Sequence, residues 1–97
     1  MITKNEIIKK LVTLRETLSE KHKVKSIGVF GSVIRGEQRE DSDIDVLVEF
    51  KDDADIFDLM GLELFLQEEF DQKVDVVSKR ALRDEIKDVV LKEVIYS

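Results

Sequence analysis

The stretch from Gly31 to Phe50, GSVIRGEQREDSDIDVLVEF, sets a Gly-Ser pair ahead of three alternating acids and an apolar run. From position 43 onward apolar side chains fall on every second position, which predicts a strand with one face in the core. Asp43 and Asp45 share the opposite face, with Cα atoms about 6 to 7 Å apart, and Asp41 precedes them. Carboxylates this close repel each other unless a cation lies between them. The pattern therefore predicts a metal site at the start of this strand.

The ligand types favour Mg²⁺ as the metal. The chain has no Cys and a single His, so the ligands on offer are oxygen atoms, which hard ions prefer. A site with few protein carboxylates, completed by substrate phosphates, is typical of Mg²⁺, for which Mn²⁺ can substitute. A calcium-binding EF-hand loop fails because Val46 stands where it needs Gly and Asp52 where it needs Glu. A solvated acidic loop without a ligand stays open as the alternative.

Gly31 and Ser32 form a candidate phosphate-binding turn. Glycine lets backbone N–H groups approach an anion, and Ser32 is expected to cap a helical turn that runs through Arg35 and ends at Gly36. A Gly-Ser turn alone is more often a plain cap, so this prediction depends on the acids that follow. A phosphate cradle beside a metal site indicates a nucleoside triphosphate.

Helix and strand signals precede this stretch. Thr3 and Glu6 form a capping box, which predicts the start of an N-terminal helix with one apolar face. That helix is expected to end at the basic cluster of residues 21–25, with His22 in solvent. Residues 24–30 are rich in β-branched and aromatic side chains and predict a first strand.

The second half of the chain continues the alternation of helices and strands. Asp55 is expected to cap a helix that ends near Phe70. The β-branched run at 73–77 predicts another strand, with Asp75 at its centre. A helical stretch is expected from Ser78, and residues 94–96 predict a short edge strand in which Tyr96 has no catalytic role. Neither repeats nor linkers interrupt the pattern, so we expect a single domain over residues 1–97.

Charge and composition restrict the partners and the compartment. The net charge of -6 argues against long nucleic acid as the main partner, because phosphate neutralisation needs clustered Lys and Arg. No segment approaches the roughly eighteen uncharged apolar residues that a membrane helix needs, and the first ten residues do not resemble a secretory leader. The absence of Cys fits a reducing compartment. We therefore expect a cytoplasmic protein.

The motif resembles a known signature. The run G31-S32-x-x-R35-G36-E37, followed by D41-S42-D43-I44-D45, is similar to the signature of the polymerase-beta-type nucleotidyltransferases. More closely, the chain resembles the minimal nucleotidyltransferases, which are encoded beside HEPN-domain toxins. The resemblance continues through KVDVVS to the ALRDEIKDVVLKEVIYS tail. It implies an α/β (α+β) fold with a small mixed sheet flanked by helices.

The resemblance also implies roles for the site residues. Gly31 and Ser32 would hold the β and γ phosphates of the nucleotide, and Arg35 would add a cation near them. Three carboxylates would bind the metal ions and carry catalysis: Asp43, Asp45 and Asp75. Ile34 departs from the pattern because many relatives have a small residue there, which puts the fit of the turn in question.

By the same resemblance, the reaction would move AMP from ATP to a hydroxyl group. No residue of the sequence identifies the base, so ATP is expected as the donor from the family resemblance alone. Larger relatives have a helical domain that holds the acceptor, so here the acceptor is expected on another molecule. In the related systems it is a tyrosine of the partner HEPN ribonuclease toxin. Two alternatives stay open: an antitoxin that masks its toxin by binding alone, and nucleotidylation of a small-molecule hydroxyl.

Overall fold

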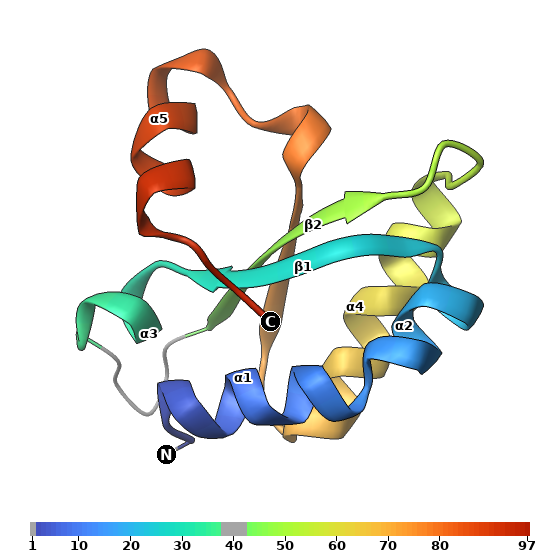
Figure 1. Cartoon of the computed structure of the whole chain (residues 1–97), viewed down its shortest axis with the longest axis horizontal. Coiled ribbons are helices and arrows are strands. Elements are labelled where there is room, and N and C mark those ends of the chain that lie inside the picture. Colours follow the sequence, from blue (N-terminus) through green and yellow to red (C-terminus); the bar gives the residue numbers. More distant parts are fainter. Residues whose placement is uncertain (1, 38–42) are drawn as a thin grey trace.

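The computed structural model describes residues 2–37 and 43–97. Within them lies a four-stranded sheet in the order β3-β2-β1-β4 (Figure 1). β1 pairs antiparallel with β2 and with β4, whereas β2 and β3 run parallel. The strands are β1 Val24–Phe30, β2 Ile44–Phe50, β3 Val74–Ser78 and β4 Ile95–Tyr96. The expected mixed sheet flanked by helices is confirmed.

The helices divide between the two faces of this sheet. The described helices are α1 Lys4–Thr13, α2 Arg15–His22, α3 Ser32–Arg35, α4 Ile56–Phe70 and α5 Asp84–Glu93, with a 3-10 turn η1 at Lys79–Ala81. Apolar side chains of α1, α2 and α4 form one core with β1, β2 and β3. α5 stands apart from these three helices (Figure 1). No helix of the described residues is long and apolar enough to cross a membrane.

The alternation of side chains along β2 determines which face of the sheet packs on the core and which face carries the carboxylates. Ile44, Val46 and Val48 are fully buried in the main core. Leu47 is also buried, but outside that core cluster, as is Val90 of α5. Since neighbouring strand residues point to opposite faces, Asp43, Asp45 and Leu47 lie on the face away from α1 and α4. The strand therefore buries one face and presents carboxylates on the other.

The N-terminal helix differs in detail from its prediction. The capping box between Thr3 and Glu6 is present, with the Glu6 amide donating to the Thr3 hydroxyl at 3.2 Å. A turn at Leu14 divides the helix into α1 and α2. His22 is not solvated as expected, because its ring packs 4.7 Å from that of Phe65. Burial lowers the pKa of His22, while Asp58 acts in the opposite direction.

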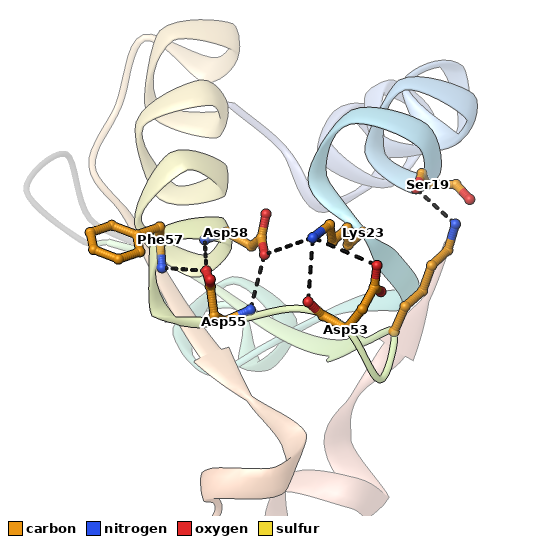
Figure 2. A network of polar contacts seen from close by, with 7 residues as sticks. Ser19, Lys23, Asp53, Asp55, Phe57 and Asp58 are labelled. Atoms are coloured by element: carbon orange, nitrogen blue, oxygen red, sulfur yellow. Dashed lines mark hydrogen bonds and ion pairs between the residues drawn. The ribbon is translucent and has the colours of Figure 1, made fainter.

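A polar network fixes the start of α4. Asp55 caps the helix by accepting hydrogen bonds from the amides of Phe57 and Asp58, and the Asp58 side chain accepts from the Asp55 amide at 2.9 Å. Lys23 then contacts Asp53 and Asp58 at 3.6 Å each. Figure 2 shows Lys23 between these two acids. The network ties the end of α2 to the start of α4.

The C-terminal region begins differently from its prediction. Ser78 ends β3 and is paired with Val48, so the strand ladder continues past the expected helix start. The turn η1 follows, and α5 begins only at Asp84. The short edge strand is confirmed as β4, where Tyr96 pairs with Gly28. β4 pairs with the edge of β1 that β2 does not occupy.

Candidate functional site

Strand pairing brings two of the predicted acids together. Asp45 of β2 is the register partner of Asp75 in β3, and on its other side it pairs with Phe30 of β1. Because register partners project to the same face, the side chains of Asp45 and Asp75 are neighbours. Asp43 precedes β2 by one residue and, in the strand alternation, shares the face of Asp45. Asp41 lies outside the described residues.

Gly31 lies against the Asp45 carboxylate. Its backbone has φ 81 and ψ -148, a conformation that is essentially restricted to glycine. A Cβ atom built on Gly31 would overlap the Asp45 Oδ2 atom and would lie 3.1 Å from its Cγ. Gly31 therefore has two separate reasons to be glycine, and one of them is the close approach of its backbone to a site carboxylate.

The turn after Gly31 leaves its serine hydroxyl unused. Gly31, and not Ser32 as expected, stands at the N-cap of α3, where its carbonyl accepts from the amides of Ile34 and Arg35 at 3.1 Å each. Among the described residues, no hydrogen bond engages the Ser32 hydroxyl. Ile34 packs partly buried against the core, so the larger side chain fits the turn. With respect to residues 2–37 and 43–97, Ser32 thus keeps a free hydroxyl beside Gly31.

Asp45 is the electrostatically strained member of the group. Burial is the largest cause, and together with the nearby Asp75 and Asp43 carboxylates it raises the pKa of the Asp45 carboxyl to about 6, against a smaller opposing effect of Arg35. A half-buried acid beside two other acids holds its proton more tightly. A bound cation would relieve this strain, so the site favours positive charge.

The carboxylates do not form a closed ligand set in this structure. Asp43 contacts Lys73 at 3.8 Å, a weak and exposed ion pair. Within residues 2–37 and 43–97 no three acidic or histidine side chains lie close enough together to hold a metal ion. The joint ligation of metal by Asp43, Asp45 and Asp75 stays a prediction. Their donor set, three carboxylates without sulfur or imidazole, suits Mg²⁺ or Mn²⁺.

Arg35 is held by two acids. The Arg35 guanidinium donates to the carboxylates of Glu93 in α5 at 2.8 Å and Glu37 at 3.3 Å, and the hydrogen bond to Glu37 contributes most to raising its pKa. Its predicted role as a phosphate contact requires it to exchange one of these partners. Glu93 is largely buried, at 13% exposure, and raises the pKa of Asp45. Sequence reasoning missed Glu93, because no local pattern relates it to Arg35, which lies 58 positions away in the chain.

The residues of this face can bind a phosphate chain and a cation side by side. Gly31 offers a backbone without a side chain of its own, and Ser32 offers a hydroxyl that no other described residue engages. The Asp45 carboxylate lies directly against Gly31. Phosphate oxygens at this turn would therefore lie next to any ion that the carboxylates bind. That juxtaposition is the arrangement phosphoryl and nucleotidyl transfer require.

Comparison with known proteins gives concordant matches. Residues 11–97 match the family described as nucleotidyltransferase domain. The chain is 41% identical over 96 residues to the protein adenylyltransferase MntA of Thermococcus cleftensis, covering 99% of this chain and 97% of that protein. A crystal structure of a toxin-antitoxin with AMP-PNP is similar, with TM-score 0.72, 29% identity, and 98% of this chain and 72% of that chain covered. The toxin-antitoxin structure MntA-HepT is also similar, with TM-score 0.62 and 27% identity, and the match covers 96% of this chain and 67% of that chain.

Proposed function

The chain belongs to the nucleotidyltransferase domain family, and we propose that it transfers AMP from ATP to a hydroxyl group of a partner protein. The close approach of Gly31 to the Asp45 carboxylate carries the proposal, because it sets a phosphate-binding turn directly against a carboxylate. The 41% identical relative is named a protein adenylyltransferase, and a similar solved structure contains the ATP analogue AMP-PNP. Both support ATP as the donor.

Each site residue has a distinct part in this reaction. Backbone N–H groups near Gly31 and the Ser32 hydroxyl would donate hydrogen bonds to phosphate oxygens, and Arg35 would add positive charge. Asp43, Asp45 and Asp75 would hold Mg²⁺ or Mn²⁺, which when bound neutralises the triphosphate and lowers the pKa of the acceptor hydroxyl. The acceptor oxygen forms a bond to the α-phosphorus as the bond to the β-phosphate breaks, and pyrophosphate leaves in line. Asp75 would orient the acceptor hydroxyl and take its proton.

The acceptor that we propose is a tyrosine of a HEPN-type ribonuclease toxin. Two similar solved structures are toxin-antitoxin complexes, which favours a protein partner. α5 also offers apolar contacts beside the site: Ile86 and Val89 are exposed on the same helix that carries Glu93. AMP on the tyrosine would silence the toxin. Masking by binding alone is the second candidate function, because toxin-antitoxin pairs also act through contact.

The test incubates the chain with Mg-ATP and a co-encoded HEPN-type protein. We expect mass spectrometry to find one or more AMP units on a tyrosine of the partner, with loss of its ribonuclease activity. The control is the double variant Asp43→Asn with Asp45→Asn, which should transfer nothing. If that variant inhibits the partner as well as the wild type does, and no AMP is found on any residue, the protein acts by binding alone.

Replacing Asp75 by Asn is expected to reduce turnover far more than nucleotide binding. Asp75 is exposed and lies on β3, the edge strand of the sheet next to the strand that carries Asp45. This position suits a role toward the acceptor hydroxyl. Affinity for Mg-ATP should stay within about tenfold, because most contacts with the triphosphate would persist. Calorimetric titration and a radiolabelled transfer assay separate the two quantities. Loss of binding in proportion to turnover would instead make Asp75 a main ligand of the triphosphate-bound metal.

A further inference from the structure

The outer side of α4 carries an apolar stripe that the described part of the chain leaves uncovered. Phe57, Met60 and Leu64 are 75%, 55% and 63% exposed. At helical spacing they share one face, which points away from the buried Leu62 and Leu66. Figure 2 shows the Phe57 ring turned away from the polar network at the start of the helix. α4 is therefore apolar on two opposite faces, and the sheet covers one of them.

Gly61 borders this stripe, between Met60 and Leu64 along the chain. A Cβ atom added to it would have no heavy atom within 4 Å, and its φ is not positive. Since glycine within a helix costs about 1 kcal/mol relative to alanine, neither packing nor backbone geometry among the described residues accounts for it. A missing side chain lets the backbone of another helix come close, because interhelical distance depends on the side chains at the contact. The stripe is thus shaped for a helix crossing at Gly61.

Charge around the stripe selects the kind of partner. Positions 52–72 hold eight Asp or Glu residues and neither Lys nor Arg. Glu63 and Glu68, on or next to the stripe, make no ion pair with the described residues. A second copy would set these acids against each other across a two-fold axis. A membrane surface is disfavoured because helices that lie on membranes carry Lys and Arg on their polar side.

We propose that this stripe anchors the acceptor protein through an amphipathic helix whose apolar side chains are bordered by Lys or Arg. The identity of that partner rests on the proposed function. α4 packs on the core face of the sheet, whereas Asp43 and Asp45 lie on the other face. Anchoring therefore leaves the carboxylates free to receive an acceptor hydroxyl, and the partner meets the chain at two separate surfaces.

The test measures binding of the co-encoded HEPN-type protein to the full chain by calorimetry, without nucleotide. Leu64→Glu is expected to weaken binding by about thirtyfold or more, as for a central apolar contact. Val12→Glu makes the same change at a residue of α1 that is 45% exposed, and should bind like the wild type. Binding should also weaken as salt is raised, because exposed charges are screened.

A second variant separates anchoring from folding. Gly61→Gln should raise the melting temperature of the isolated chain by several degrees, because helix propensity improves, and should weaken partner binding. A residue with a structural role alone would not move the two quantities in opposite directions. Partner binding that Leu64→Glu weakens and Val12→Glu does not would support anchoring even if AMP transfer is never observed, because binding is measured without nucleotide. Equal binding by the wild type and Leu64→Glu, absence of wild-type binding, or a dimer of the chain that Leu64→Glu disrupts would overturn the proposal.

Discussion

Replacing Asp45 by Asn should reduce AMP transfer by about a thousandfold or more, because metal ligation contributes several kcal/mol to the transition state and each 1.36 kcal/mol is tenfold in rate. Asp43→Asn should lose transfer as strongly, without loss of thermal stability. Asp88→Asn on α5 is the matched control, since Asp88 is an exposed acid, and it should keep full activity. Transfer assays at saturating Mg-ATP measure these differences. Wild-type rates in either Asp43→Asn or Asp45→Asn would refute the carboxylate site.

The same Asp45 variant should stabilise the protein when metal is removed. In the folded state the pKa of Asp45 is raised to about 6 from 3.8, so ionisation of this carboxyl opposes folding. The destabilisation is fully present above pH 6 and is lost as the pH falls toward the unfolded value. Asp45→Asn should therefore melt higher than the wild type at pH 7.5 in EDTA, and the difference should disappear near pH 4. An unchanged difference across this range would contradict the assigned burial and charge of Asp45.

Replacing Gly31 by Ala should disrupt the site more than any other single methyl group added to the chain. The φ of 81 and ψ of -148 would be strained for alanine by about 1 to 3 kcal/mol. The new Cβ atom would also displace the Asp45 carboxylate. Since displacements of about 1 Å in an active site can change rates a hundredfold, we expect at least that loss in transfer, together with weaker Mg-ATP binding.

Gly36 provides the control for backbone strain alone. Its φ of 73 and ψ of 20 are left-handed, and a Cβ atom there would meet nothing within 4 Å. Gly36→Ala should lower stability by about 1 kcal/mol and leave most of the transfer rate. Thermal melts and transfer assays on both variants distinguish the effects. If Gly36→Ala lost as much activity as Gly31→Ala, strain in the turn, and not contact with Asp45, would explain the result.

Local patterns were sufficient to predict much of the fold. The strand at 24–30, the helical turn at 32–35 and the helix ending at Phe70 lie where their side-chain spacing and caps placed them. Asp43 and Asp45 were predicted as neighbours because two residues of one strand share a face regardless of the rest of the chain. These features depend on short-range geometry, which the sequence expresses directly.

Features that depend on distant contacts were harder to predict. The antiparallel pairing of β1 with β2, and the register that joins Asp45 to Asp75, form between segments far apart in the chain. The pairing of Arg35 with Glu93 brings together residues 58 positions apart, and no local pattern indicates it. Ser78 was predicted to open a helical stretch, and it is the N-cap of the 3-10 turn η1, but the ladder with Val48 also makes it the last residue of β3.

The alternation in β2 has an evolutionary consequence. Ile44, Val46 and Val48 support the core, while Asp43 and Asp45 contribute nothing to that core. A single nucleotide change turns an Asp codon into an Asn codon, so a gene copy could lose transfer in one step and still encode a folded chain with its α4 stripe intact. A catalyst and a purely blocking antitoxin are then neighbours in sequence space. Duplicated copies of such a gene can diverge between the two roles without passing through an unfolded ancestor.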